Sequence, residues 1–314
     1  MGSYTVHSGT STSAPLAAAI IALNAEVRGT LEPELMNNLF SSTAKPQPFS
    51  DGHKIFSELA PAPQQGGGIV QAYDAAYTAS LLSPASLSFN DTDHLATNLN
   101  FTITNKGSHA VTYKLGQVPS LTIAVVGVTA KPAAGVINPK RLALWSGYVT
   151  INGTNGSALS MPYQGLTGSL RKATVLARHQ AWVFHSTDST DFTRSPDRFT
   201  YVVPKADTSE DDDDLPAIGV NLALGSPMLH IDVVPVGNGT ETSKSIGEPF
   251  GLPSPLNERG WTSFPWDGQL QSGKYAPAGQ YRFVVRALRI FGDASKPHDW
   301  DVATTQSIIL KYKS

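Results

Sequence analysis

Residues 9–15 read Gly-Thr-Ser-Thr-Ser-Ala-Pro and are followed directly by the apolar run Leu-Ala-Ala-Ala-Ile-Ile-Ala-Leu at residues 16–23. Hydroxyl residues before an apolar run, with proline in the first turn, are typical of a helix start. The run has no polar face, and a helix that is apolar all round is buried. The sequence therefore predicts a buried helix from Pro15 to Leu23, far shorter than the roughly 20 residues that span a membrane.

The hydroxyl residues of this stretch have two interpretations. In the simpler one they cap a core helix and have no chemical role. In the other, Ser11 is a nucleophile, because the N-terminus of a helix offers unsatisfied N–H groups and a partial positive charge to a developing oxyanion. Gly9 lets the backbone come close just before the serine. The seven residues alone do not decide between the two, but the downstream sequence favours the second.

Two further segments follow in order. Residues 30–44 predict a second helix that begins at Pro33. Its apolar residues recur at helical spacing: Leu35, Met36, Leu39 and Phe40. Residues 64–70, Gln-Gln-Gly-Gly-Gly-Ile-Val, then precede alanines at positions 72, 75 and 76. A triglycine alone would indicate only a turn, so the order of the three segments is the informative feature.

Together these segments resemble the end of the catalytic domain of subtilases, the subtilisin-like serine proteases, whose nucleophile motif is Gly-Thr-Ser-Met-Ala-x-Pro. The resemblance covers residues 1–80 and places Ser11 as the nucleophile. The supporting matches are Gly9, Thr10, Ala14 and Pro15. Thr12 replaces the usual methionine and Ser13 the usual alanine. Sedolisins, the acid-acting serine-carboxyl peptidases, carry a similar Gly-Thr-Ser motif, but the two following segments favour subtilases.

The resemblance implies peptide-bond hydrolysis through an acyl-enzyme on Ser11, with protein or peptide substrates and without a cofactor or metal. It also implies an extracellular location for a complete family member. Residues 1–4 do not have the apolar segment of a signal peptide.

The rest of the chain resembles the C-terminal extension of secreted fungal-type subtilases of the Vpr-like minor extracellular protease group. The matching stretches lie at residues 82–92, 161–165, 266–268 and 277–281. The first two fall where that family has a fibronectin-III-like domain. The expected fold class is therefore mainly β, with a truncated remnant of an α/β subtilisin-like domain that contributes helices.

Three domains are predicted on this basis: residues 1–80 as the C-terminal segment of the catalytic domain, 81–170 as a fibronectin-III-like β-sandwich, and 171–314 as a second β-sandwich. Alternating residues at 99–103 and 111–115, and at 148–151 and 159–163, predict two hairpins. Further strands are predicted at residues 218–224, 229–236, 280–290 and 306–312. Trp261, Trp266 and Trp300 are expected in the core of the second sandwich rather than in a sugar-binding platform.

The other members of a subtilase triad are not found in this sequence. The family places its acid in Asp-Ser/Thr-Gly and its base in His-Gly-Thr, both before the serine, and neither motif precedes Ser11. None of the eight histidines is followed by Gly-Thr, and His7 is tethered too close to Ser11 to act as its base. We therefore expect the chain alone to be inactive. The alternative function is a non-catalytic β-sandwich binding or scaffold protein that keeps a protease relic.

Composition limits the partners. A net charge of −2 gives no reason to expect nucleic acid or an anionic membrane surface. The absence of cysteine excludes disulfides and thiolate metal sites. In the polar segment 205–215, Glu210 is followed by the four consecutive aspartates Asp211–Asp214, whose oxygens suit calcium, but consecutive aspartates do not converge as the alternating ligands of a calcium loop do. A solvated loop is expected there. The sequence indicates no oligomeric state.

Five Asn-x-Ser/Thr sequons fit the acceptor pattern for N-linked glycosylation. They are centred on Asn90, Asn100, Asn152, Asn155 and Asn238. Several fall in predicted turns, which supports a secretory route for the chain.

Overall fold

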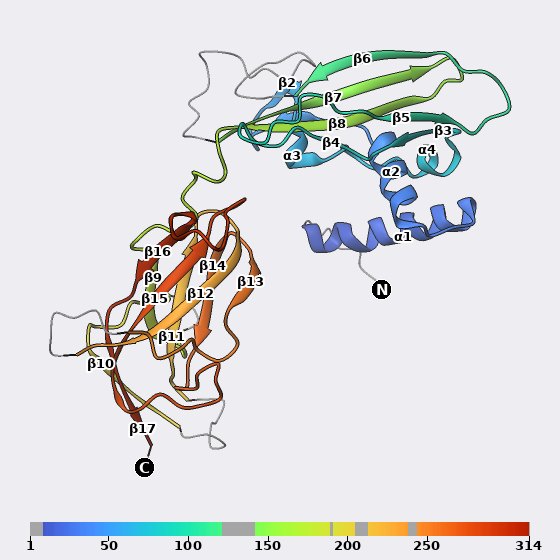
Figure 1. Cartoon of the computed structure of the whole chain (residues 1–314). Helices are drawn as coiled ribbons and strands as arrows, with labels where there is room; N and C mark the ends of the chain where they lie inside the picture. Colours follow the sequence, from blue (N-terminus) through green and yellow to red (C-terminus); the bar gives the residue numbers. More distant parts are fainter. Residues whose placement is uncertain (1–8, 121–141, 189–190, 205–212, 238–243, 314) are drawn as a thin grey trace, which may run out of the picture. The chain divides into compact units, whose positions relative to one another are not determined.

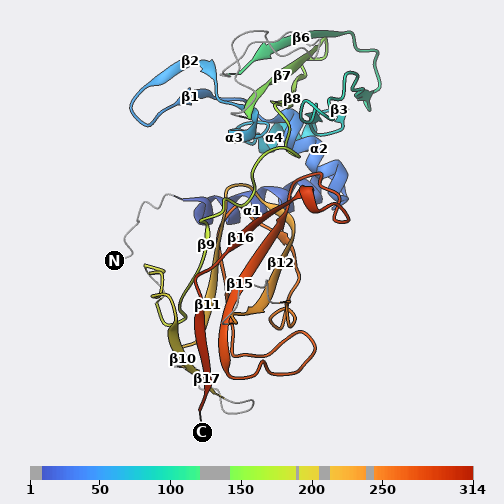
Figure 2. The same ribbon diagram turned by 60° about the vertical axis from the view of Figure 1, so that its left-hand side comes forward.

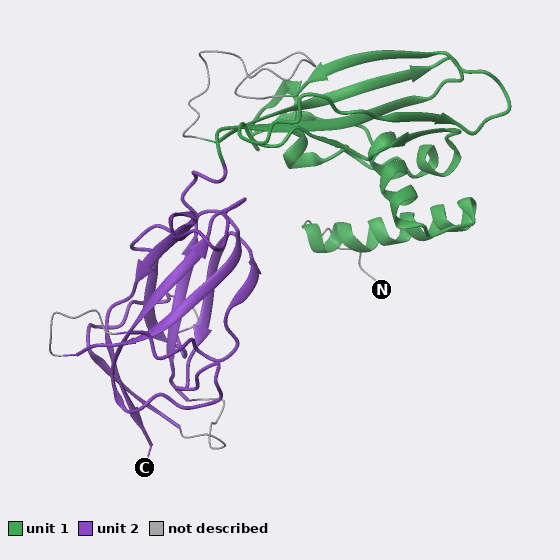
Figure 3. Cartoon of the chain, viewed as in Figure 1, with its two compact units in different colours: residues 1–169 green, residues 170–314 purple. Residues whose placement is uncertain are grey.

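The computed structural model describes residues 9–120, 142–188, 191–204, 213–237 and 244–313. It is mainly β, with a few helices and several small sheets (Figure 1). The chain divides into two compact units, residues 1–169 and 170–314 (Figure 3). Residues 1–80 and 81–170, predicted as separate domains, therefore fall almost entirely within one unit.

The described residues of the first unit form four α-helices: α1 (Thr10–Arg28), α2 (Pro33–Thr43), α3 (Ala62–Gln65) and α4 (Ala72–Tyr77). Helix α2 begins at the predicted proline, and the Glu32 side chain accepts hydrogen bonds from the backbone N–H groups of Glu34 and Leu35. Met36 and Leu39 are buried on one side of α2, as their spacing predicts.

The strands of the first unit form three sheets. β1 (Pro48–Ser50) pairs with β2 (Ile55–Leu59) in a two-stranded hairpin (Figure 2). β3 (Ser80–Ser83) pairs with β5 (Thr102–Asn105). The four-stranded sheet has the order β4-β8-β7-β6, formed by Leu87–Ser88, Ala158–Thr167, Ala143–Gly153 and Tyr113–Pro119. The hairpin β1–β2 was not predicted. The segment before residue 80 therefore contains strands as well as helices.

One of the two predicted hairpins of the first unit is confirmed. β7 and β8 pair antiparallel, with Asn152 opposite Ala158 beside the turn. The hairpin expected between residues 99–103 and 111–115 is wrong, because β5 pairs back to β3 and β6 pairs with β7. The Asn105 side chain does accept from the Gly107 N–H at the expected turn, but the strands on either side of it pair with other strands.

Strand β7 is buried on both faces. Trp145, Val149 and Ile151 lie on one face, in a cluster of buried residues that includes Leu82, Phe89 and Met161. On the other face, the Ser146 hydroxyl accepts a hydrogen bond from the Ala62 backbone N–H at 3.0 Å. The Tyr148 hydroxyl on that face donates to the Gly66 carbonyl at 3.0 Å, and burial raises the pKa of Tyr148 to about 12. The segment that contains α3 therefore lies against the sheet.

The stretch at residues 161–165 contains a glycine with a packing role. Gly165 lies opposite Trp145 in the β7–β8 ladder. A Cβ atom on Gly165 would come within 2.1 Å of the Trp145 indole ring. The large side chain can lie flat across the neighbouring strand only because this position has no side chain.

Two sheets make up the second unit. A three-stranded sheet has the order β14-β11-β9, formed by Gly260–Pro265, Pro216–Leu222 and Ala181–His185. The larger sheet has the order β10-β17-β15-β12-β13, formed by Phe199–Val203, Ile308–Tyr312, Gly279–Leu288, Ser226–Pro235 and Ser254–Asn257. β16 (Trp300–Thr304), preceded by the 3-10 turn Pro297–Asp299, also pairs with β15. β10 and β17 run parallel, and the other pairs are antiparallel.

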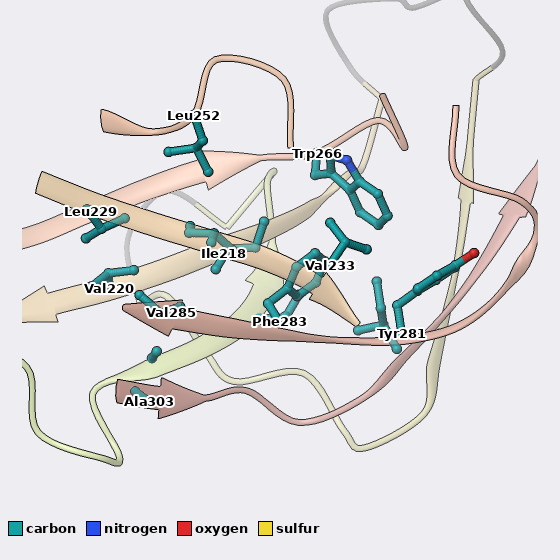
Figure 4. Packing of buried hydrophobic residues seen from close by; sticks show 14 of the residues in the cluster. Ile218, Val220, Leu229, Val233, Leu252, Trp266, Tyr281, Phe283, Val285 and Ala303 are labelled. Atoms are coloured by element: carbon teal, nitrogen blue, oxygen red, sulfur yellow. The ribbon is translucent and has the colours of Figure 1, made fainter. Parts of the chain in front are cut away.

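Both sheets contribute to one buried core in the second unit (Figure 4). Ile218 and Val220 come from the smaller sheet, and Ile231 and Phe283 from the larger. Trp266 is buried in this core and meets Phe283 edge to face, with ring centroids 5.2 Å apart. The expectation that Trp266 packs in the core is confirmed.

Trp261 and Trp300, expected in the same core, are only half-buried and lie outside it. Trp261 packs on Trp182, with ring centroids 4.7 Å apart, and lies across Gly219 of the neighbouring strand. The reason is strand alternation: their side chains point away from the face that the two sheets share.

Two buried aspartates hold the start of the second unit. Asp301 accepts hydrogen bonds from the backbone N–H groups of Val175 and Leu176 and from Arg289. Asp299 accepts from Arg171 Nη2 at 2.6 Å and from the Asp293 backbone N–H at 2.9 Å. The hydrogen bond from Arg171 is the main cause that lowers the pKa of Asp299 to about 2.

Truncating the core of the second unit will destabilise it. We expect Phe283→Ala to lower the free energy of unfolding by about 3–5 kcal/mol, because it opens a cavity beside Trp266. Phe250, which is 66% exposed, is the matched control, and Phe250→Ala is expected to change stability by less than about 0.5 kcal/mol. Urea denaturation of the full chain, followed by tryptophan fluorescence, measures both. Equal effects of the two variants would contradict the core assignment.

The Arg171–Asp299 contact predicts a pH dependence. The folded-state pKa of Asp299 is about 2 against an ordinary 3.8, so the charged carboxylate stabilises the fold above pH 3.8 and this contribution is lost as the pH falls toward 2. Asp299→Asn is therefore expected to lower the urea midpoint at pH 7, and the difference from wild type is expected to narrow between about pH 4 and pH 2. Asp191→Asn, at an exposed position, serves as the control. A difference that is constant with pH would show that the charge is not responsible.

Candidate functional site

Ser11 lies in the first turn of α1 and is exposed. The helix begins at Thr10, five residues before the predicted start at Pro15, so the hydroxyl residues lie inside it rather than before it. Gly9 is the N-cap, with φ 144°, and its carbonyl accepts hydrogen bonds from the backbone N–H groups of Thr12 and Ser13, each at 3.2 Å. Pro15 is the sixth residue of the helix, past its first turn, so its missing N–H leaves the Ser11 carbonyl without an intrahelical partner.

Helix α1 is not buried, contrary to the sequence prediction. Leu16 is 63% exposed, Leu23 60% and Val27 47%. Figures 1 and 2 show α1 on the side of α2 and α4 away from the sheet. The apolar sequence of α1 predicts that other elements cover the helix. Among the described residues, no element covers most of it.

The C-terminal half of α1 holds it to the unit. The Asn24 side chain, the one buried residue of α1, donates to the Ala72 carbonyl at 3.3 Å. Arg28 Nη2 donates to the carbonyls of Ala75 and Thr78 at 2.6 and 2.8 Å. The Arg28 contacts satisfy carbonyls at the end of α4, and the Asn24 contact reaches its first residue, but together they cover little apolar surface.

A catalytic base is not joined to Ser11. Among the described residues, no histidine or carboxylate hydrogen-bonds to the Ser11 hydroxyl, and His7 lies outside the described residues. The structure does orient three imidazoles through a carboxylate at Nδ1, which is the base half of a serine triad. The pairs are His94–Asp91 at 2.8 Å, His185–Asp214 at 2.6 Å and His230–Glu248 at 2.7 Å.

The acidic segment 205–215 is described only from Asp213 onward, so its other aspartates lie outside the described residues. Asp213 forms an ion pair with Lys313, and Asp214 bonds His185. Within the described residues there is no group of three or more histidine, aspartate and glutamate side chains that could hold a metal ion.

Four of the five sequon asparagines are described, and Asn238 lies outside the described residues. Asn100, Asn152 and Asn155 are exposed, while Asn90 is half-buried and has a positive φ of 65°. The Asn155 side chain is engaged locally: its Oδ1 accepts from the Ser157 hydroxyl at 2.7 Å, and its Nδ2 donates to the Ser80 hydroxyl at 3.3 Å.

The first unit also contains an open cleft of about 830 Å³, which lies within the usual range of small-ligand pockets, roughly 300–1,000 Å³. Four separate segments line it: the end of α2 with Lys45, the residues of α4 and after it, the loop at 105–111 and the turn at 154–159. Sequence reasoning missed this cleft, because each segment alone shows only ordinary polar and tyrosine residues.

Two exposed tyrosines of α4 stand out in the cleft. Tyr73 and Tyr77 are 74% and 60% exposed, and their ring centroids lie 4.7 Å apart. Their spacing of four residues brings both side chains to one side of the helix. Asn105, His109 and Asn155 line other parts of the cleft.

Comparison with known proteins identifies no family. No protein-family model matches the chain, and no curated protein matches it significantly. A crystal structure of human mucin-like protocadherin EC1-2 is similar over 74% of this chain and 98% of that chain, at 11% identity and a TM-score of 0.23. A match of this quality assigns neither fold family nor function. No helix among the described residues is long and apolar enough to cross a membrane.

Proposed function

We propose that residues 1–80 are the C-terminal segment of the catalytic domain of a secreted subtilisin-like serine endopeptidase. Residues 81–170 would be its fibronectin-III-like domain and residues 171–314 a second β-sandwich. The observation that supports the proposal is the position of Ser11, exposed in the first turn of a helix whose apolar side chains are uncovered. A serine that is to attack a peptide needs access to its substrate, and the first turn of α1 leaves Ser11 accessible.

The chemistry proposed for Ser11 is acyl transfer. Its hydroxyl would attack a substrate carbonyl, and the proton would pass to a histidine base oriented by an aspartate. The free N–H groups in the first turn of α1 would face the developing oxyanion, where the helix dipole is favourable. The histidine, the aspartate and an oxyanion-hole asparagine would come from polypeptide outside these 314 residues.

The surface of α1 fits this proposal. From Thr10 to Ala25 the helix carries no charged side chain, so its whole circumference suits burial. In a doubly wound α/β domain such a helix lies against a parallel sheet with other helices beside it. Covering α1 in this way would supply the substrate cleft at the same time, since the neighbouring strands would lie beside Ser11.

The second candidate function is a non-catalytic binding or scaffold protein. The cores of both units form without α1, since Leu82, Trp145 and Met161 pack in one and Phe283 and Trp266 in the other. A chain whose β-rich parts fold without the helix could keep Ser11 only as a relic.

The chain alone is expected to lack endopeptidase activity. Loss of triad members leaves only about 10³–10⁴-fold catalysis over water even in a complete protease, and neither Asp-Ser/Thr-Gly nor His-Gly-Thr precedes Ser11 here. Wild type and Ser11→Ala are therefore expected to hydrolyse an activated peptide ester at equal, background rates. Turnover that depends on Ser11 would contradict this expectation.

The proposed family is tested by the coding DNA upstream of Met1. An open frame that encodes Asp-Ser/Thr-Gly and His-Gly-Thr motifs is expected, and a fluorophosphonate probe should label the longer polypeptide at Ser11. Labelling should disappear in Ser11→Ala and persist in Ser13→Ala, which removes a hydroxyl in the same stretch of helix. A stop codon without these motifs, or labelling unaffected by Ser11→Ala, would favour the binding protein instead.

A further inference from the structure

We propose that the cleft of the first unit, lined by Tyr73, Tyr77, Lys45, Asn105 and Asn155, binds a neutral oligosaccharide. This inference does not depend on the function proposed for Ser11, because the cleft is formed by other elements. It rests on four properties of the lining: exposed aromatic rings, balanced charge, amide and hydroxyl groups, and the kind of backbone present.

The tyrosines provide the apolar contact. Tyr73 and Tyr77 keep most of their surface exposed, although aromatic side chains contribute most when they are covered. The two rings are tilted by 45° and lie side by side on α4. Within the described residues, neither tyrosine hydroxyl makes a hydrogen bond, so each ring offers an apolar face and a free polar end. This combination suits a ligand whose own faces alternate between C–H and O–H groups.

The charges of the cleft favour a neutral ligand. Its one lysine and one aspartate, Lys45 and Asp74, pair with each other at 3.9 Å. An anionic ligand such as a phosphate or a nucleic acid would need surplus cations, which dominate that kind of binding. A cationic ligand would need surplus carboxylates. The lining has neither surplus cations nor surplus carboxylates.

The remaining polar groups are amides and hydroxyls. Asn105 donates to the His109 carbonyl at 2.7 Å and accepts from the Gly107 N–H at 2.9 Å, which fixes its amide in place. Asn155 Oδ1 accepts from both the N–H and the hydroxyl of Ser157, and its Nδ2 donates to the Ser80 hydroxyl. An amide can make up to four hydrogen bonds, so Asn105 keeps one donor and one acceptor position and Asn155 keeps one donor. Positioned donors and acceptors of this kind complement the hydroxyls of a sugar.

The backbone of the cleft does not favour an extended peptide. Peptides that bind along a protein's backbone use the open edge of a strand. Here the lining consists of the end of α2 with Lys45, the short helix α4, the loop at 105–111 and the turn at 154–157, together with the ends of β5 and β8. Recognition would therefore rest on side chains, as it does for saccharides.

Titration calorimetry of the full chain tests the proposal. The probes are three neutral tetrasaccharides, built of glucose, mannose or N-acetylglucosamine. The chain should be produced without N-linked glycans, because a glycan on Asn155 would itself occupy the cleft. We expect saturable binding of at least one probe, and we expect Tyr73→Ala and Tyr77→Ala each to weaken it about tenfold or more, which corresponds to 1.4 kcal/mol.

Two controls separate ring contact from general disturbance. Tyr73→Phe keeps the ring and should retain binding, and Phe250→Ala removes an exposed ring of the second unit and should have no effect. Both tyrosines are exposed, so their replacement is expected to leave folding unchanged. Failure of all three probes to bind, binding unaffected by either alanine variant, or tighter binding of an uncharged peptide at the same residues would overturn the proposal.

Discussion

The two-sided burial of β7 is the interaction on which the first unit depends. One face of this strand packs Trp145, Val149 and Ile151 into the β core, and the other receives the segment around α3 through Tyr148 and Ser146. A strand that is buried on both faces couples the layers packed against it. Removing either the α3 segment or the β core would expose one face of β7 to water. This coupling explains why residues 1–169 form one compact unit although the sequence predicted a domain boundary near residue 80.

Helix α1 does not pack against β7 or its two layers. Its attachment relies on polar contacts of Asn24 and Arg28 with α4, and its apolar side chains stay exposed. A surface of this kind marks an interaction site in a soluble protein. The same helix carries Ser11, so under the function proposed above one neighbouring part of a catalytic domain would account for both the uncovered helix and the triad partners that Ser11 lacks.

Local sequence predicted local structure well. The start of α2 at Pro33, the turn between β7 and β8, and the burial of Trp266 follow from capping, turn chemistry and apolar size. The pairing of β3 with β5, and of β6 with β7, could not be predicted, because register between distant strands is decided by shared burial rather than by the turn at 105–107. Likewise, residues 9–15 identified Ser11 as a candidate, whereas the cleft is assembled from four distant segments and leaves no motif.

The central claim, that α1 is uncovered while the rest of the unit packs without it, can be tested directly by hydrogen–deuterium exchange of the full chain. Backbone amides between Leu16 and Leu23 should exchange much faster than those of α2 around Leu39 and those of β7 around Val149, since uncovered helices open at little cost. Protection of Ile20 and Ile21 equal to that of Leu39 would contradict the account, because it would show that the helix has a partner within this chain.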